Sequence, residues 1–159
     1  MTKKLRNIIL GVCFFLGAGA NSAKKDSNFE FNLSGLKPWQ AELFIKAGRK
    51  SWGVKVKRNN LSKNRAYLVK KPEAKAMFAR FYINAHKGEI NYKIAFRDEV
   101  NWADCSKPNS EGWNFYRFAE HEWGHILGYE HTINPFSVMY SSENDPFYKF
   151  YPEFDFCKN

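Results

Sequence analysis

The chain has 159 residues and a formal charge of +9, and 44% of its residues are apolar and 18% aromatic. A disordered chain would be poor in aromatic residues, and a collagen-like or low-complexity chain would hold far more than 10 glycines and 6 prolines. No apolar run reaches the roughly 18 residues that a membrane-spanning helix requires, so the composition predicts one compact folded domain and no transmembrane segment.

Residues 1–20 have the features of a signal peptide. Three basic residues precede an apolar stretch that ends in Ala18-Gly19-Ala20, a small-residue pattern typical of a cleavage site, and cleavage as late as Ala23 also fits. The alternative is an N-terminal helix of the mature fold. We therefore expect an exported protein, secreted or periplasmic, whose mature part is a single domain over residues 24–159.

A strand and a helix begin the predicted domain. Phe29, Phe31 and Leu33 alternate with polar residues, as in a strand with one buried face. The segment from Leu36 to Ser51 has apolar residues at helical spacing, a proline in its first turn and a glycine shortly after its end, and these features predict a helix.

Four more strands are predicted at residues 54–58, 66–69, 77–84 and 90–96. In the last of them the side chains alternate, and those expected to share one face are Ile90, Tyr92, Ile94 and Phe96.

A second helix is predicted from about Asn114 to Leu127, after a polar loop from Asn101 to Gly112. Asn114 is a suitable N-cap, and the inward face of the helix is expected to consist of Phe115, Ala119 and Ile126. The order of strand, helix, four strands and helix predicts an α+β fold in which two helices cover one sheet.

The second predicted helix carries a metal-binding pattern, His121-Glu122-Trp123-Gly124-His125, which continues through Gly128 to His131. Residues four apart share a helix face, so His121 and His125 can hold one zinc ion with ring nitrogens about 2 Å away. A third ligand requires the chain to bend, and Gly128 can adopt the left-handed conformation that turns His131 back to the metal. Three protein ligands leave the fourth position to water, as in a catalytic zinc site. The alternative is an amphipathic helix with surface histidines.

Glu122 is the expected general base. It follows the first ligand by about 100° around the helix, so its carboxylate can reach a water on the zinc without binding the metal itself. Zinc lowers the pKa of such a water to about 7, and Glu122 can accept its proton and pass it to a leaving amine. The remaining histidine, His86, is expected to be an ordinary surface or core residue rather than a ligand.

Two cysteines remain once a signal peptide with Cys13 has been removed. They are Cys105 and Cys157, and an even pair in an oxidising compartment predicts a disulfide. The alternatives are two free thiols, or one thiol that meets the metal.

Charge is unevenly distributed along the mature chain. Residues 24–97 hold 18 basic and 5 acidic side chains, a net +13, whereas residues 98–159 hold 4 and 11, a net −7. The basic part could contact an anionic surface, but it contains no block of like charges, so a solvated surface is the alternative and no nucleic-acid partner is expected.

The metal-binding pattern, followed eight residues later by Met139 in Ser137-Val138-Met139-Tyr140, resembles the zinc motif and Met-turn of the metzincin metalloproteases. Thr132 after the third histidine and the Met-Tyr pair are more similar to the matrixin branch than to the astacins. The resemblance implies one catalytic zinc ion as cofactor. It also implies that Met139 supports the metal site from below without binding the metal.

The resemblance also implies a fold, over Asn28 to Ser142. It is α+β, with a twisted five-stranded mixed sheet, two main helices and a short C-terminal subdomain. In that fold the fourth strand is an antiparallel edge strand above the cleft, where an extended peptide adds as a further strand.

The sequence therefore predicts a secreted, monomeric zinc endopeptidase that hydrolyses peptide bonds in peptides or proteins. One alternative is a zinc-binding adhesion or inhibitory module that has lost turnover, although such a module has no need of Glu122. Another is a basic polymer-binding protein with an incidental zinc site.

Overall fold

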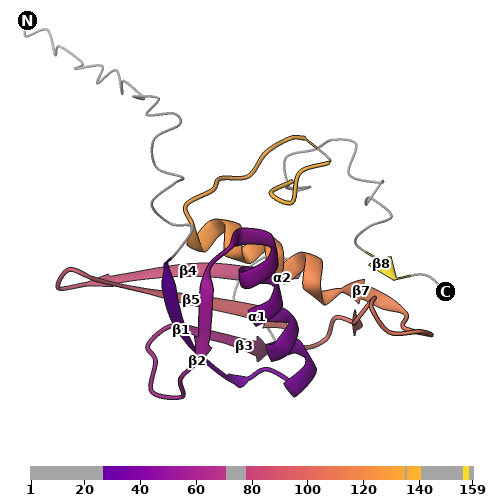
Figure 1. Ribbon diagram of the computed structural model, residues 1–159, viewed down its shortest axis with the longest axis horizontal. Coiled ribbons are helices and arrows are strands. Elements are labelled where there is room, and N and C mark those ends of the chain that lie inside the picture. The colour runs from indigo at the N-terminus through magenta and orange to yellow at the C-terminus, as the bar shows by residue number, and fades with distance from the viewer. Residues whose placement is uncertain (1–26, 71–77, 135, 141–155, 158–159) are drawn as a thin grey trace, which may run out of the picture.

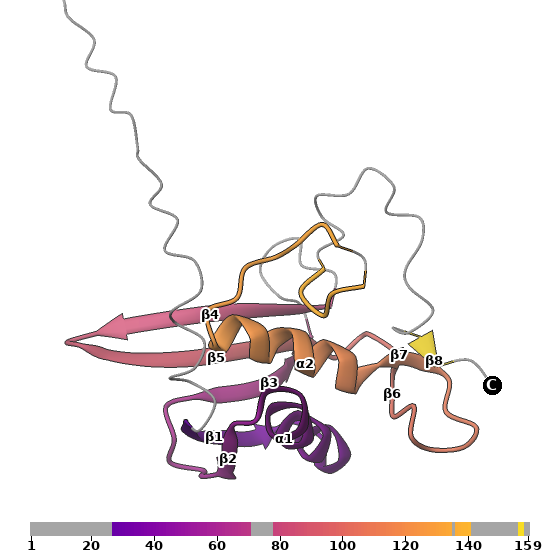
Figure 2. The same cartoon turned by 45° about the horizontal axis from the view of Figure 1, so that its top comes forward.

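The computed structural model describes residues 27–70, 78–134, 136–140 and 156–157, which form a layered α+β fold (Figure 1). Two helices lie against a five-stranded sheet, and a small three-stranded sheet lies near the start of the second helix (Figure 2). The elements in chain order are β1 (Asn28–Gly35), α1 (Pro38–Trp52), β2 (Lys55–Arg58), β3 (Arg65–Val69), β4 (Ala79–His86), β5 (Glu89–Arg97), β6 (Trp102–Ala103), β7 (Gly112–Asn114), α2 (Phe115–Ile126) and β8 (Phe156–Cys157).

The five-stranded sheet has the strand order β2-β1-β3-β5-β4. The pairs β1–β2, β1–β3 and β3–β5 are parallel, and β4 pairs antiparallel with β5 at one edge. The α+β fold with a five-stranded mixed sheet and two main helices is thus confirmed, and so is the antiparallel edge position of the fourth strand.

Trp123 lies at the centre of the core between the sheet and the helices. Its side chain is fully buried, and its ring centroid lies 5.4 Å from that of Phe31 and 5.1 Å from that of Phe44. Its indole Nε1–H donates to the backbone oxygen of Phe44 at 2.9 Å. Because Trp123 follows His121 by two residues, about 200° around the helix, its anchoring in the core turns the histidines away from the core.

The prediction of a polar loop from Asn101 to Gly112 is wrong at both ends of this segment, where the structure has short strands. Strands β6 and β7 pair there in parallel, and β8 pairs antiparallel with β7. Strands of two or three residues are too short to show a period of two, and β8 comes from a distant part of the chain.

The face that Ile90 shares with Ile94 and Phe96 is buried only in the second part of β5. Ile90 is 57% exposed, whereas Ile94 and Phe96 are fully buried. Strand β3 pairs with β5 only from Lys93 to Arg97, so β4 is the only strand that pairs with the first part of β5 in the described residues, in a hairpin that projects beyond the sheet (Figure 1).

A disulfide joins Cys105 to Cys157, with the two Cα atoms 5.3 Å apart, and fastens β8 beside β7. The predicted signal peptide, Met77 of the fourth predicted strand and most of the expected C-terminal subdomain lie outside the described residues. None of the helices in the described part of the chain has the length and apolar character needed to span a bilayer.

Candidate metal centre

Helix α2 begins and ends where its sequence provides caps. The Asn114 side chain accepts a hydrogen bond from the Arg117 backbone N–H at 3.3 Å. At the other end Gly128 has φ = 86°, and the Tyr129 N–H donates to the oxygen of Gly124 at 2.9 Å. This left-handed ending reverses the chain, so that His131 returns to the face of the helix that carries the other two histidines.

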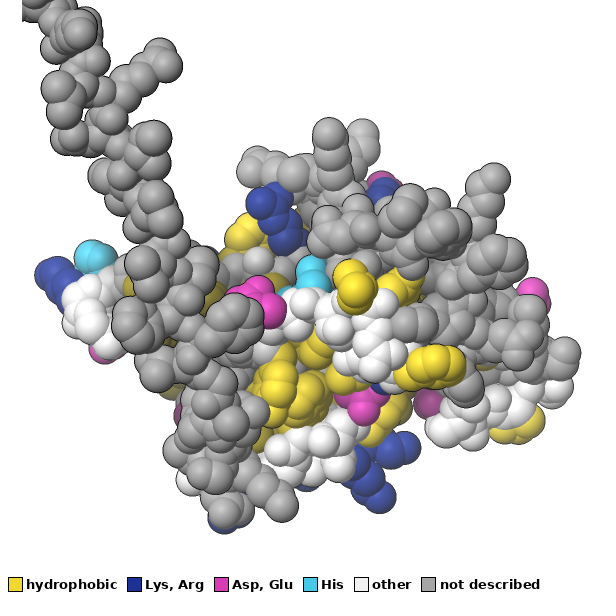
Figure 3. All heavy atoms as spheres, turned by 90° about the horizontal axis from the view of Figure 1, so that it is seen from above, with side chains coloured by type: hydrophobic (Ala, Val, Ile, Leu, Met, Phe, Trp, Pro, Cys, Tyr) yellow, Lys and Arg dark blue, Asp and Glu magenta, His cyan; other side chains and the backbone are white. Residues whose placement is uncertain are grey.

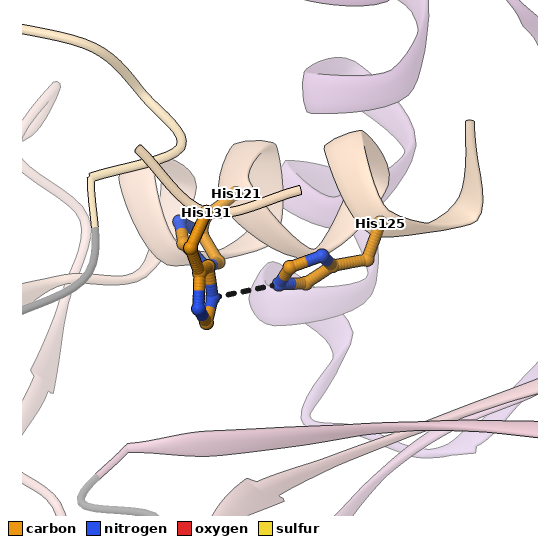
Figure 4. A group of neighbouring side chains, drawn as sticks. All are labelled: His121, His125 and His131. Carbon is orange, nitrogen blue, oxygen red and sulfur yellow. Dashed lines mark hydrogen bonds between the residues drawn. The ribbon is translucent and has the colours of Figure 1, made fainter. Parts of the chain in front are cut away.

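The three histidines point toward one another (Figure 4). The Nε2 atom of His131 lies 3.1 Å from that of His121 and 3.0 Å from that of His125. Within the described residues, these three side chains form the group that could hold a metal ion.

Two of the rings are fixed by backbone carbonyl groups. Nδ1 of His121 lies 2.7 Å from the oxygen of Val138, and Nδ1 of His125 lies 3.0 Å from the oxygen of Tyr129. A carbonyl oxygen can only accept, so in each neutral ring the proton is on Nδ1 and the Nε2 lone pair is available. The Nε2 lone pairs of His121 and His125 both face Nε2 of His131, which can donate a proton to one of them or bind a cation together with them.

The nitrogen spacing fits zinc. Bonds of about 2.0–2.1 Å in a tetrahedral site place ligand atoms roughly 3.3 Å apart, close to the separations seen here. Burial lowers the pKa of His121 to about 4, even though the hydrogen bond to Val138 raises it, and burial also lowers the pKa of His125. Both imidazoles are therefore neutral near pH 7, which is the form that binds metal.

Glu122 is buried beside these ligands. Its side chain is 5% exposed, and its Oε2 atom has no hydrogen-bond partner in the described part of the chain. Burial raises the pKa of this carboxyl to about 8. A buried carboxyl oxygen without a partner costs stability, and here it belongs to the residue that follows His121.

The turn that contains Met139 contacts both helix α2, which carries His121, and the segment that carries His131. Besides the Val138 oxygen that holds His121, the Met139 oxygen accepts from the Thr132 N–H at 2.9 Å, next to His131. The Met139 side chain is 4% exposed and packs against Gly124, where a Cβ atom would collide with the Met139 sulfur. Met139 thus lies against the helix turn between His121 and His125, and the turn that carries it fixes the orientation of His121.

Strand β4 borders the site on the side of the sheet edge. The ring of Phe81 stacks on His125, with centroids 5.6 Å apart and an angle of 21° between the planes. In Figure 2, β4 runs above the part of α2 that lies farther from β7. In Figure 3, imidazole is visible near the middle of the face, beside apolar side chains, and His131 is the exposed member of the three histidines.

Comparison with known proteins identifies the family. The family model described as matrixin matches residues 24–153, which is most of the chain. The chain belongs to the matrixin family. No curated protein matches it. Matrixins are zinc-dependent peptidases, and in this matrixin the zinc ligands could be His121, His125 and His131.

The sequence did not predict four features of this matrixin site. The carbonyl groups of Val138 and Tyr129 are backbone groups, so no residue type marks them. Phe81 comes from a strand about 40 residues before the histidines, and no local pattern connects the two. Gly124 did leave a signal, because a glycine inside a helical pattern costs stability and often marks close packing.

Proposed function

We propose that this matrixin is an exported zinc endopeptidase in which Glu122 is the general base. The observation that carries the proposal is the convergence of three Nε2 atoms, two of them with their Nδ1–H groups held by backbone carbonyls. Such second partners fix the tautomer and the ring orientation of metal ligands.

Zinc in a three-histidine site supplies Lewis acidity, makes water a nucleophile near neutral pH and, as a cation, favours the ionised form of a nearby carboxyl. Glu122 then takes a proton from the attacking water. Burial raises the pKa of this carboxyl to about 8 when no cation is nearby, and a zinc ion would lower it again, so that Glu122 would be ionised and able to accept the proton. The same carboxyl returns the proton to the leaving amine.

The substrate is a peptide in extended conformation. Strand β4 is the last strand of its sheet, and in the described residues it pairs only with β5, so its outer edge offers backbone groups to a further strand. Phe81 connects this strand to His125, and a peptide paired with β4 would therefore pass in front of the histidines.

Export is the second part of the proposal. Residues 1–20 are the signal peptide and residues 24–159 the mature domain, which acts as a monomer. The disulfide between Cys105 and Cys157 supports a periplasmic or extracellular location, since such bonds are rare in reducing compartments.

Replacing Glu122 with Gln tests the mechanism. Gln preserves the side-chain volume and removes no ligand, so zinc should stay bound while hydrolysis of a peptide library falls by at least about 10². The matched control is Glu120→Gln on the same helix, since Glu120 pairs with Arg117 and does not belong to the metal site. Near-normal turnover of the Glu122 variant would refute the general-base role. Absence of chelator-sensitive cleavage by the zinc-loaded wild type would favour the adhesion or inhibitory module.

A further inference from the structure

The sheet has a second face, turned away from the helices. Ala66, Ile94 and Phe96 point toward the helices and are buried, so the residues that alternate with them point to the opposite face. The strand register aligns these outer residues in rows. Reading from β1 to β4, one row holds Asn32, Arg65, Lys93 and Tyr82, and the next holds Gly35, Tyr67, Ala95 and Arg80.

A hollow of about 310 Å³ lies over the first three strands of these rows. Gly35 lets Tyr67 approach β1 closely at one end of the hollow, since a Cβ atom at Gly35 would lie 2.5 Å from the Cβ atom of Tyr67. The volume is at the lower end of the range found for ligand pockets. The residues whose side chains carry charge or hydrogen-bonding groups into its lining are Asn32, Ser34, Arg65, Tyr67 and Lys93.

Arg65 and Lys93 are paired in register on neighbouring strands, with no acidic side chain in the lining of the hollow. Like charges directly opposite one another destabilise a sheet. Three cations of the basic half have acidic partners, in the pairs Arg58–Glu42, Lys63–Glu89 and Arg97–Glu99. Within the described residues neither Arg65 nor Lys93 has such a partner, so the two positive charges are left for an anion from outside the chain.

Asn32 and Ser34 also line the hollow, and hydrogen bonds fix the position of the Asn32 side chain. Asn32 Oδ1 accepts from the Ser34 N–H at 3.1 Å and from the Ser34 hydroxyl at 2.7 Å, and Asn32 Nδ2 donates to the oxygen of Asn60 at 2.8 Å. The Ser34 oxygen keeps lone pairs that can accept from a ligand hydroxyl. Tyr67 adds an aromatic face and a phenol, whose pKa is raised chiefly by burial, so that the hydroxyl stays a donor.

We propose that this hollow binds an acidic polysaccharide, with a sulfate or carboxylate group between Arg65 and Lys93 and a sugar ring against Tyr67. A guanidinium next to an ammonium suits a polyatomic anion, and the hydroxyl and aromatic groups suit a sugar. A membrane surface fits less well, because the cations lie in a hollow and no exposed large apolar side chain lines it. The site lies on the far side of the sheet from the histidines, so it would hold the protein on an anionic matrix without obstructing the zinc cleft.

The test is binding of a fluorescent heparin-derived octasaccharide to the zinc-loaded mature protein at low salt. Wild type should bind, and affinity should fall as salt rises. The double variant Arg65→Gln with Lys93→Gln should bind at least about tenfold more weakly. The control with the same charge change is Lys50→Gln with Lys87→Gln, on the opposite helix and at the hairpin tip, and it should bind within about twofold of wild type. Neither double variant should change hydrolysis of a small peptide.

A second readout separates binding from misfolding. Lys93→Gln alone removes the repulsion with Arg65, so its thermal midpoint without ligand should be equal to or above that of wild type while its binding weakens. Equal losses in the two double variants would show that only diffuse charge matters and would overturn the proposal. So would absence of octasaccharide binding, or tighter binding to a single-stranded oligonucleotide or to phosphatidylserine vesicles.

Discussion

Gly124 is the residue that lets the Met139 turn approach the metal helix. Alanine is a better helix former than glycine by about 1 kcal/mol, so Gly124→Ala would stabilise an isolated helix. In this fold the added methyl group would meet the Met139 sulfur and also lie 3.2 Å from Trp52. We therefore expect Gly124→Ala to lower the free energy of unfolding by about 1–3 kcal/mol, measured in urea.

A double-mutant cycle provides the control for this prediction. Met139→Ala removes the atom that Gly124→Ala would strike, so the glycine substitution should cost little or nothing when made in that background. Additive effects of the two substitutions would mean that Met139 does not pack against Gly124 in solution.

The three proposed zinc ligands can be predicted from the sequence, but the groups that orient their rings cannot. Histidines four apart on a helix, and a glycine that permits a left-handed turn, are recognisable by residue type and spacing. The Val138 and Tyr129 carbonyl groups that orient His121 and His125 depend on where the following turns run. The orientation of the rings could therefore be obtained only from the three-dimensional fold.

The sequence predicts well those helices and strands whose apolar residues recur at a regular spacing. It does not predict the very short strands, which show no such spacing. Helix α2 was expected from Asn114 to Leu127 and is found at Phe115–Ile126, and the expected inward residues Phe115, Ala119 and Ile126 are all buried. Strands β6, β7 and β8 have two or three residues each, and their pairing depends on contacts distant in sequence. No local pattern predicts such contacts, and the covalent bond of Cys105 to Cys157 provides one of them.

Removing the disulfide should loosen the small sheet more than the metal helix. The bond joins residues 52 apart, and a loop of that length corresponds on the chain-entropy model to about 4 kcal/mol of stability. We expect the Cys105→Ser, Cys157→Ser variant to unfold at lower temperature than wild type, in the presence of zinc in both samples. Intact mass after alkylation without reduction is the control, and two alkylated cysteines in the exported wild type would contradict the disulfide.

Across the whole molecule, the two oppositely charged parts of the sequence have different structural tasks. Residues 24–97, with a net charge of +13, contain all five strands of the main sheet, and residues 98–159, with a net charge of −7, contain the metal helix and the Met139 turn. The basic charge is therefore shared between the sheet, helix α1 and the segments that connect them, and the metal site is assembled in an acidic part of the chain. The proposed polysaccharide site and the proposed zinc site therefore belong to different parts of the sequence.

The zinc content of the purified mature protein tests the account most directly. Wild type should contain one zinc ion per chain by elemental analysis after dilution and dialysis. His131→Ala should lose zinc under the same conditions, because two histidines cannot keep the geometry of three. His86→Ala is the matched control and should retain it, since His86 lies at the far end of β4. Full zinc retention by His131→Ala, or loss of zinc by His86→Ala, would contradict the assignment of the three ligands.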